Sequence, residues 1–99
     1  MSKERDVLES SVEAYLRKQV SLRGGECVKF IPDLKRGFPD RIVILPHGAL
    51  AWVETKRPVG GVLDGAQKIA HILLRRLGQR VFICYTKDQV DSLLLELGF

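Results

Sequence analysis

The apolar residues of this chain follow two different periods. Between residues 2 and 22 they recur every three or four positions, which is typical of an amphipathic helix. Further along they form short continuous runs, such as Ile42–Leu45 and Leu50–Val53, which are typical of buried strands. The whole pattern predicts the order helix, strand, strand, strand, helix, strand, helix. A strand that follows a helix returns parallel by a right-handed crossover, so we expect an α/β fold with a mixed central sheet and helices on both faces.

Three helices are predicted, each with an apolar stripe that we expect to face the sheet. The stripe of the first helix consists of Leu8, Val12, Tyr15, Leu16 and Val20. The second helix is predicted over residues 65–77, with Ile69, Ile72, Leu73 and Leu77 inward. The last helix follows Thr86 and carries Val90, Leu93, Leu94 and Leu97. His71 of the second helix is expected at the surface or half-buried.

The strands Glu26–Ile31 and Val81–Tyr85 complete the predicted sheet, and the two middle runs form a hairpin. Pro46-His47-Gly48 separates these runs, and Gly48 occupies the last loop position, where a three-residue loop needs a left-handed residue. Leu45 should then face Ala49. Both faces of the hairpin strands are largely apolar, so we expect both faces to be covered.

Counting outward from that pairing places Asp40 opposite Glu54, with their Cβ atoms about 4.5–5.5 Å apart. The strand period of two puts Lys56 on the same face as Glu54. Two acids and one amine therefore meet at one strand end, which is typical of a divalent-metal site with an attendant base or electrophile. The same pattern also occurs on exposed hairpin ends with solvated charges, so its interpretation depends on the rest of the chain.

The bulk composition bounds the possible functions. Ninety-nine residues form a single domain, and the net charge of +4 suits an anionic partner. Cys27 and Cys84 lie in apolar runs without further ligands at zinc spacing, which favours free thiols in a reducing compartment. No apolar run approaches the roughly 20 residues that span a bilayer, and the charged beginning of the chain is unlike a signal peptide. We expect a cytoplasmic protein without a membrane partner.

Several polar residues outside the hairpin are candidates for the same site. Glu9 falls within the stripe of the first helix, whereas Glu13 lies just beyond its edge, and a core-facing carboxylate needs an ion pair or a cation. Gln67 fits the capping box Asp64-Gly65-Ala66-Gln67, which gives it an ordinary structural role. Lys35 and Arg36 precede Asp40 and could hold a phosphate backbone, although a polar loop explains them equally well.

These motifs, in this order, resemble the VRR-NUC branch of the PD-(D/E)xK nuclease superfamily. The resemblance rests on Gly37-Phe38-Pro39-Asp40-Arg41, Val53-Glu54-Thr55-Lys56, Gly60-Gly61 followed by Gln67, and an acidic first helix. It covers essentially all of residues 1–99 and implies a restriction-endonuclease-like αβββαβ core, here with an additional C-terminal helix. It assigns the helix carboxylate to Glu9, with Glu13 as the alternative.

The resemblance implies a metal-dependent nuclease that cuts DNA. Asp40 and Glu54 would bind Mg²⁺, or Mn²⁺ in its place, together with the backbone carbonyl of Thr55, and Glu9 would act directly or through water. Lys56 would orient the attacking water or stabilise the phosphate, and Gln67 would position either of them. Residues predicted to contact DNA are Lys29, Lys35, Arg36, Arg41 and Arg57.

Small members of this family resemble junction-cleaving enzymes of viruses and phages that work as symmetric dimers. We therefore expect a homodimer that cuts four-way junctions or other branched DNA in a bacterial or phage-infected cell. The alternative is a non-catalytic nucleic-acid-binding or assembly module on the same fold. The loss of an acid or the lysine from the site would favour that alternative, and Asp40, Glu54 and Lys56 are all present.

Overall fold

The computed structural model describes residues 9–31 and 36–99, without the side chains of Glu9 and Ser10. The predictions made for residues 2–8, for Lys35 and for the side chain of Glu9 lie outside this part of the chain. The elements are α2 (Glu9–Leu22), β1 (Glu26–Lys29), β2 (Arg41–Ile44), the 3₁₀ turn η1 (Pro46–Gly48), β3 (Leu50–Thr55), α3 (Gly65–Arg76), β4 (Val81–Cys84) and α4 (Lys87–Glu96). Their order is the predicted one, although β1 and β4 are shorter than expected.

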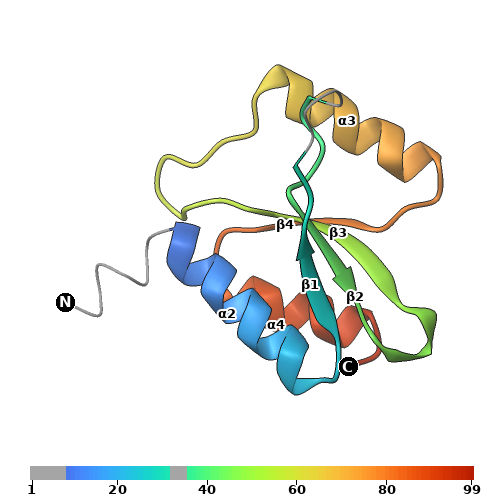
Figure 1. Ribbon diagram of the computed structural model, residues 1–99. Coiled ribbons are helices and arrows are strands. Elements are labelled where there is room, and N and C mark those ends of the chain that lie inside the picture. The colour runs from blue at the N-terminus through green and yellow to red at the C-terminus, as the bar shows by residue number, and fades with distance from the viewer. Residues whose placement is uncertain (1–8, 32–35) are drawn as a thin grey trace.

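The four strands form one mixed sheet in the order β1-β2-β3-β4. The first two pairings are antiparallel, and β4 runs parallel to β3 because α3 crosses between them. Helices α2 and α4 lie side by side on one face, and α3 lies on the other (Figure 1). The predicted α/β class and its layers are therefore confirmed. None of the helices in the described ranges has the length and apolar character that a bilayer span requires.

The hydrophobic core lies between the sheet and the α2–α4 layer. The predicted stripes of both helices are confirmed there, because Val12, Leu16 and Val20 of α2 are completely buried. They pack with residues of the sheet and of α4, namely Val43, Leu45, Ala51, Val53, Cys84, Val90, Leu93, Leu94 and Leu97. Most of the apolar burial that stabilises this domain is therefore on one side of the sheet.

The other side of the sheet corrects two predictions. The expected inward stripe of α3 is wrong, because Ile69, Ile72, Leu73 and Leu77 are all exposed, at 46–70%. The residues of α3 that contact the interior are instead Ala70, His71 and Leu74. The hairpin is likewise fully covered on one face only, since Ile44 and Leu50 remain exposed on the face that α3 partly covers. The apolar periodicity therefore marks the surface of α3 that is exposed in a single chain. It does not mark the surface that faces the sheet.

The register of the hairpin matches the prediction. Arg41 pairs with Val53, and Ile44 pairs with Leu50. The Leu45 amide donates to the Ala49 carbonyl at 2.8 Å, which closes the loop as expected. Gly48 is left-handed at φ 79°, and His47 also has a positive φ of 65°, which the sequence pattern did not indicate.

Candidate active site

The open end of the hairpin brings the predicted acids together. The register that pairs Arg41 with Val53 makes Asp40 and Glu54 the next opposed positions. Glu54 is in β3 with only 5% of its surface exposed. The backbone of Lys56 continues the sheet, because its amide donates to the Cys84 carbonyl at 2.9 Å. The backbone hydrogen bonds of the sheet therefore fix the Cα positions of Asp40, Glu54 and Lys56.

Lys56 and Gln67 both reach the same carboxylate oxygen. The Lys56 ammonium lies 3.6 Å from Glu54 Oε2, and Gln67 Nε2 donates to that oxygen at 3.3 Å. Gln67 also completes the capping box of α3, since its Oε1 accepts from the Asp64 amide and its own amide donates to Asp64 Oδ1. The structural and the functional interpretations of Gln67 therefore hold together: one end of its amide caps the helix and the other end points into the site.

Asp40 is a half-buried carboxylate with an unused acceptor. Its Oδ1 is buried and has no hydrogen-bond partner in the described part of the chain. Burial raises the pKa of Asp40, and the nearby Glu13 charge raises it further, against smaller lowering effects of Lys29 and Arg41. Its backbone carbonyl is fixed separately, because it accepts from the Phe30 amide at 2.7 Å. Burial and the Glu13 charge therefore outweigh the nearby positive charges at this carboxylate.

The donor set suits a hard cation such as Mg²⁺. That ion typically uses one or two carboxylates and keeps several waters, and Asp40 and Glu54 supply two carboxylates, one with an orphaned buried oxygen. Within residues 9–31 and 36–99, no three or more His, Cys, Asp or Glu side chains group as metal ligands. Thr55 ends β3 with its side chain completely buried, and the role of its carbonyl as a ligand stays a prediction.

The described acid of the first helix is Glu13. Its Oε2 accepts from Arg41 Nε at 2.9 Å, and its charge acts on Asp40. Arg41 Nη1 also donates to the Cys27 carbonyl at 3.3 Å, and Arg41 is only 8% exposed. The guanidinium of Arg41, one of the predicted DNA contacts, is thus directed inward and ties β2 to α2. Alternation along β2 could have shown this, since Arg41 shares the face of the buried Val43.

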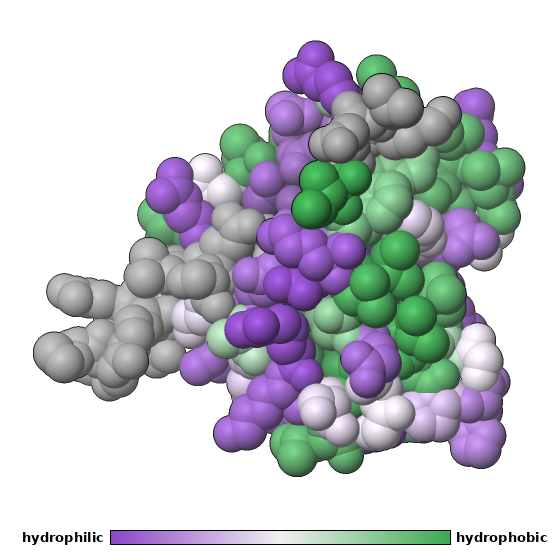
Figure 2. Space-filling model, in the orientation of Figure 1, coloured by the Kyte–Doolittle hydropathy of each residue, from purple (hydrophilic) through white to green (hydrophobic). Residues whose placement is uncertain are grey.

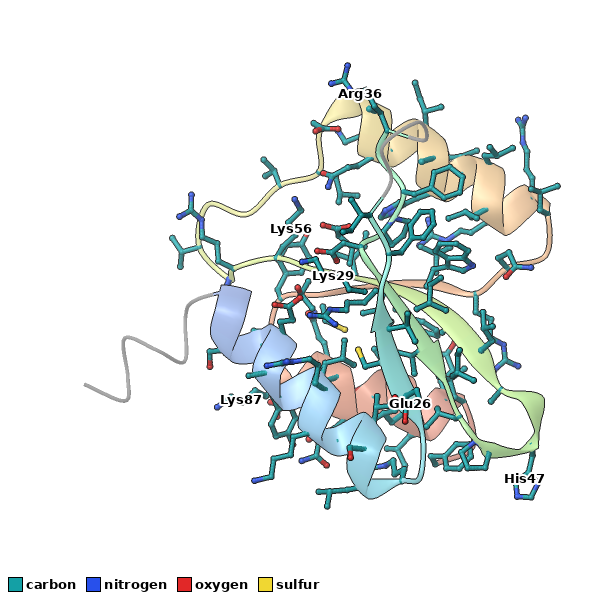
Figure 3. The ribbon with its side chains drawn as sticks, viewed as in Figure 1. Glu26, Lys29, Arg36, His47, Lys56 and Lys87 are labelled. Atoms are coloured by element: carbon teal, nitrogen blue, oxygen red, sulfur yellow. The ribbon has the colours of Figure 1, made fainter. Side chains whose placement is uncertain are left out.

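The other predicted DNA contacts fall into two groups. Lys29, Arg36 and Arg57 are exposed, and their role as DNA contacts stays a prediction. Lys35 lies outside the described residues. Lys29 and Lys56 lie at the same end of the sheet, whereas His47 marks the opposite end (Figure 3). Positive charge therefore surrounds the mouth of the candidate site.

Two motif glycines hold the site together by close backbone contact. A Cβ on Gly37 would lie 2.7 Å from the Gln67 amide nitrogen and even closer to the Ala66 carbonyl. A Cβ on Gly61 would lie 2.5 Å from the Arg57 carbonyl and 3.1 Å from Lys56 Cβ. The distances to the backbone atoms are below those found for real Cβ atoms, so only glycine fits. The loop before Asp40 thus rests on the turn that carries Gln67, and the loop after Lys56 rests on that lysine.

His71 lies deeper in the protein than predicted. It is 1% exposed rather than at the surface, and it lies one helical turn after Gln67. Its spacing of four from Gln67 is the signal that could have identified it, because positions four apart share a helix face.

Comparison with known proteins gives one similar sequence and one similar solved structure. No family model matches the chain. "Putative nuclease p44" of Acyrthosiphon pisum secondary endosymbiont phage 1 is 37% identical over 84 residues, which cover 85% of this chain and 89% of that protein. A solved structure described as "VRR_NUC domain" superimposes with a TM-score of 0.81 at 32% identity, covering 87% of this chain and 92% of its own. By this similarity in sequence and fold, the chain belongs to the VRR-NUC family of nuclease domains.

Proposed function

We propose that this protein is a metal-dependent DNA endonuclease that hydrolyses phosphodiester bonds at the open end of the β2–β3 hairpin. The observation that carries the proposal is the convergence of Asp40, Glu54, Lys56 and Gln67, with Glu54 Oε2 contacted by both the lysine and the glutamine. The nuclease name of the phage relative supports the same reaction.

Each residue has a role that follows from its chemistry. Asp40 and Glu54 would hold Mg²⁺ or Mn²⁺, with Glu9 and the Thr55 carbonyl as further candidate ligands. Such an ion, when bound, polarises a phosphoryl oxygen and lowers the pKa of a coordinated water. Lys56 donates hydrogen bonds to the attacking water or to the phosphate. Gln67 positions the water or the phosphate through its amide nitrogen, while its amide oxygen is fixed by the helix cap.

The cleavage assay tests this function directly. Labelled single-stranded, duplex, flap and four-way-junction DNA would be incubated with Mg²⁺, Mn²⁺ or EDTA. We expect cleavage that needs the ion, with Lys56→Ala reducing the rate about 10²–10⁴-fold. Lys18→Ala, which removes the same charge from an exposed position of α2, is the matched control and should cleave like the wild type. Binding of DNA without ion-dependent cleavage of any substrate would instead identify a non-catalytic binding module.

Binding of the ion can be measured without DNA. Calorimetric titration with Mn²⁺ should give binding to the wild type and much weaker binding to Asp40→Ala, because that change removes one of the two carboxylates. Equal binding by both proteins, or binding by neither, would contradict the metal site.

We further propose a homodimer that acts on four-way or other branched DNA. The supporting observation is an open apolar face, which we define as Ile44, Leu50, Ile69, Ile72, Leu73 and Leu77. Hydrophobic side chains gather between α3 and the β2–β3 hairpin (Figure 2). Exposed apolar patches of this kind mark interaction surfaces, and a second copy is a self-complementary occupant. A twofold dimer presents two sites with the symmetry of a four-way junction.

The dimer is tested with a matched pair of leucines. Leu77 lies at the end of α3 in the open apolar face and is 66% exposed, whereas Leu95 lies near the end of α4 on the opposite side of the sheet and is 73% exposed. In sedimentation experiments at micromolar concentration, the wild type and Leu95→Glu should be dimers. Leu77→Glu should be a monomer and should cleave junctions more slowly. A fully active wild-type monomer would refute the dimer while leaving the nuclease proposal intact.

A further inference from the structure

His71 is a buried polar side chain without a visible structural task. It is 1% exposed, between the buried Ala70 and Leu74 of α3. Neither Nδ1 nor Nε2 has a hydrogen-bond partner in the part of the chain that the structure describes. Buried polar groups in folded proteins are nearly always paired, and an unpaired one destabilises the fold. An apolar residue of similar size would serve packing better, so the ring calls for another explanation.

The surroundings of His71 connect it to the site. It follows Gln67 by one helical turn on the same side of α3, so their Cβ atoms are helical neighbours. Gln67 donates to Glu54 Oε2, and the Lys56 ammonium lies 3.6 Å from the same oxygen. Burial lowers the pKa of His71, and the charges of Arg75 and Lys56 lower it further. The ring is therefore neutral near pH 7 and has one nitrogen that can accept a hydrogen bond.

Lys56 has donors to spare for that acceptor. An ammonium carries three N–H groups, and the contact with Glu54 Oε2 uses one of them. If Glu54 held a cation, its carboxylate would be less available to Lys56, and the ammonium would keep its N–H groups for another acceptor. A lysine that must act on water or phosphate then needs a neutral acceptor to hold it in place, because a second carboxylate would trap it.

We propose that His71 is a positioning residue for Lys56, whose ammonium donates to the neutral imidazole, directly or through one buried water, when a cation occupies Glu54. This inference rests on the proposed nuclease function. It gives a buried ring of α3 a role in the reaction although the ring itself touches neither DNA nor the cation.

The experiment compares His71→Leu, which fills the space without an acceptor, with His71→Gln, which keeps an acceptor. We expect His71→Leu to unfold in urea at or above the wild-type midpoint and to bind Mn²⁺ with an affinity within about twofold of the wild type. Its KM should be unchanged, whereas its kcat should be about 10–100-fold lower. His71→Gln should recover most of kcat. The split between kcat and KM, together with this rescue, separates positioning from a merely structural role.

Three results would overturn the inference. His71→Leu could retain the wild-type kcat, His71→Gln could be as slow as His71→Leu, or His71→Leu could lose stability, which would show that the ring is paired for structural reasons. Loss of stability by His71→Leu counts against the inference only if His71→Met, which fills the same space with a more flexible side chain, is destabilised as well. A wild-type protein that cleaves no DNA refutes the nuclease proposal itself, whereas active wild type with equally active His71→Leu refutes only the role of His71.

Discussion

Replacing Gly37 with alanine tests how the site is assembled. Gly37 has a φ of 86°, which L-residues adopt at a cost of roughly 1–2 kcal/mol. The new methyl group would also lie 2.7 Å from the Gln67 amide nitrogen and closer to the Ala66 carbonyl, all of them backbone atoms that cannot rotate away. Overpacking of this kind costs about 1–3 kcal/mol more. We expect Gly37→Ala to lower the free energy of unfolding by about 2–5 kcal/mol.

Gly78→Ala is the matched control. Gly78 has nearly the same backbone conformation, with a φ of 83°, but nothing lies within 4 Å of the Cβ that alanine would add. It should therefore show the conformational cost alone, roughly 1–2 kcal/mol. Urea denaturation of both variants measures the difference, which isolates the contact between the Asp40 loop and the first turn of α3.

Activity gives the second half of the test. Relief of the clash requires the loop or α3 to move by about 1 Å, and a misplacement of that size can cost about 10²-fold in rate. The Gln67 amide, now 3.3 Å from Glu54 Oε2, is the group that such a movement displaces. We expect the folded fraction of Gly37→Ala to cleave about 10–100-fold more slowly, and Gly78→Ala to cleave normally. Equal destabilisation by both variants, or full activity of folded Gly37→Ala, would refute the reasoning.

Three other predictions concern stability and reactivity. Arg41→Met leaves the Glu13 carboxylate without its ion-pair partner and should lower the free energy of unfolding in urea by about 1–3 kcal/mol. Adding Glu13→Gln should recover part of this loss, and additive effects of the two changes would mean that the pair is not coupled. Because the pKa of Asp40 is raised, this carboxyl favours the folded state below its unfolded pKa of 3.8, and the contribution is lost as the pH rises through the folded pKa. In EDTA, the melting temperature of Asp40→Asn should therefore match that of the wild type at low pH and exceed it above the folded pKa of Asp40. Burial raises the pKa of Cys84 to about 12, so iodoacetamide at pH 8 should modify the half-buried Cys27 first; mass mapping that finds Cys84 modified first in native protein would contradict its burial.

The hairpin was the part of the site that sequence could predict, because its register depends on local residues. The loop length and Gly48 determine which residues pair, and period two then orders every side chain out to Asp40 and Glu54. Gln67 was equally predictable as a cap, because a capping box is a local pattern. Its contact with Glu54 is not local, and only the resemblance to a family indicated that Gln67 belongs to the site.

What sequence could not predict depends on contacts between distant elements. The apolar periodicity of α3 is real, but periodicity does not distinguish a stripe that faces the core from one that faces a second molecule. Arg41 is predicted as a DNA contact, whereas the fold places Glu13 beside its guanidinium. The fit of Gly37 against Ala66 depends on the path of a crossover that no local pattern specifies.

The uneven covering of the sheet links assembly to chemistry. The α2–α4 layer holds most of the core, whereas α3 contributes only Ala70, His71 and Leu74 to the buried interior of the described chain. Yet α3 carries Gln67, so a site that depends on sub-ångström placement is built partly on the more weakly packed layer. In the proposed dimer, a second copy on the open apolar face adds apolar burial to this layer, because that face includes the exposed flank of α3. Dimer formation then stabilises the helix that positions Gln67, and isolated subunits are expected to be less active per site than paired ones.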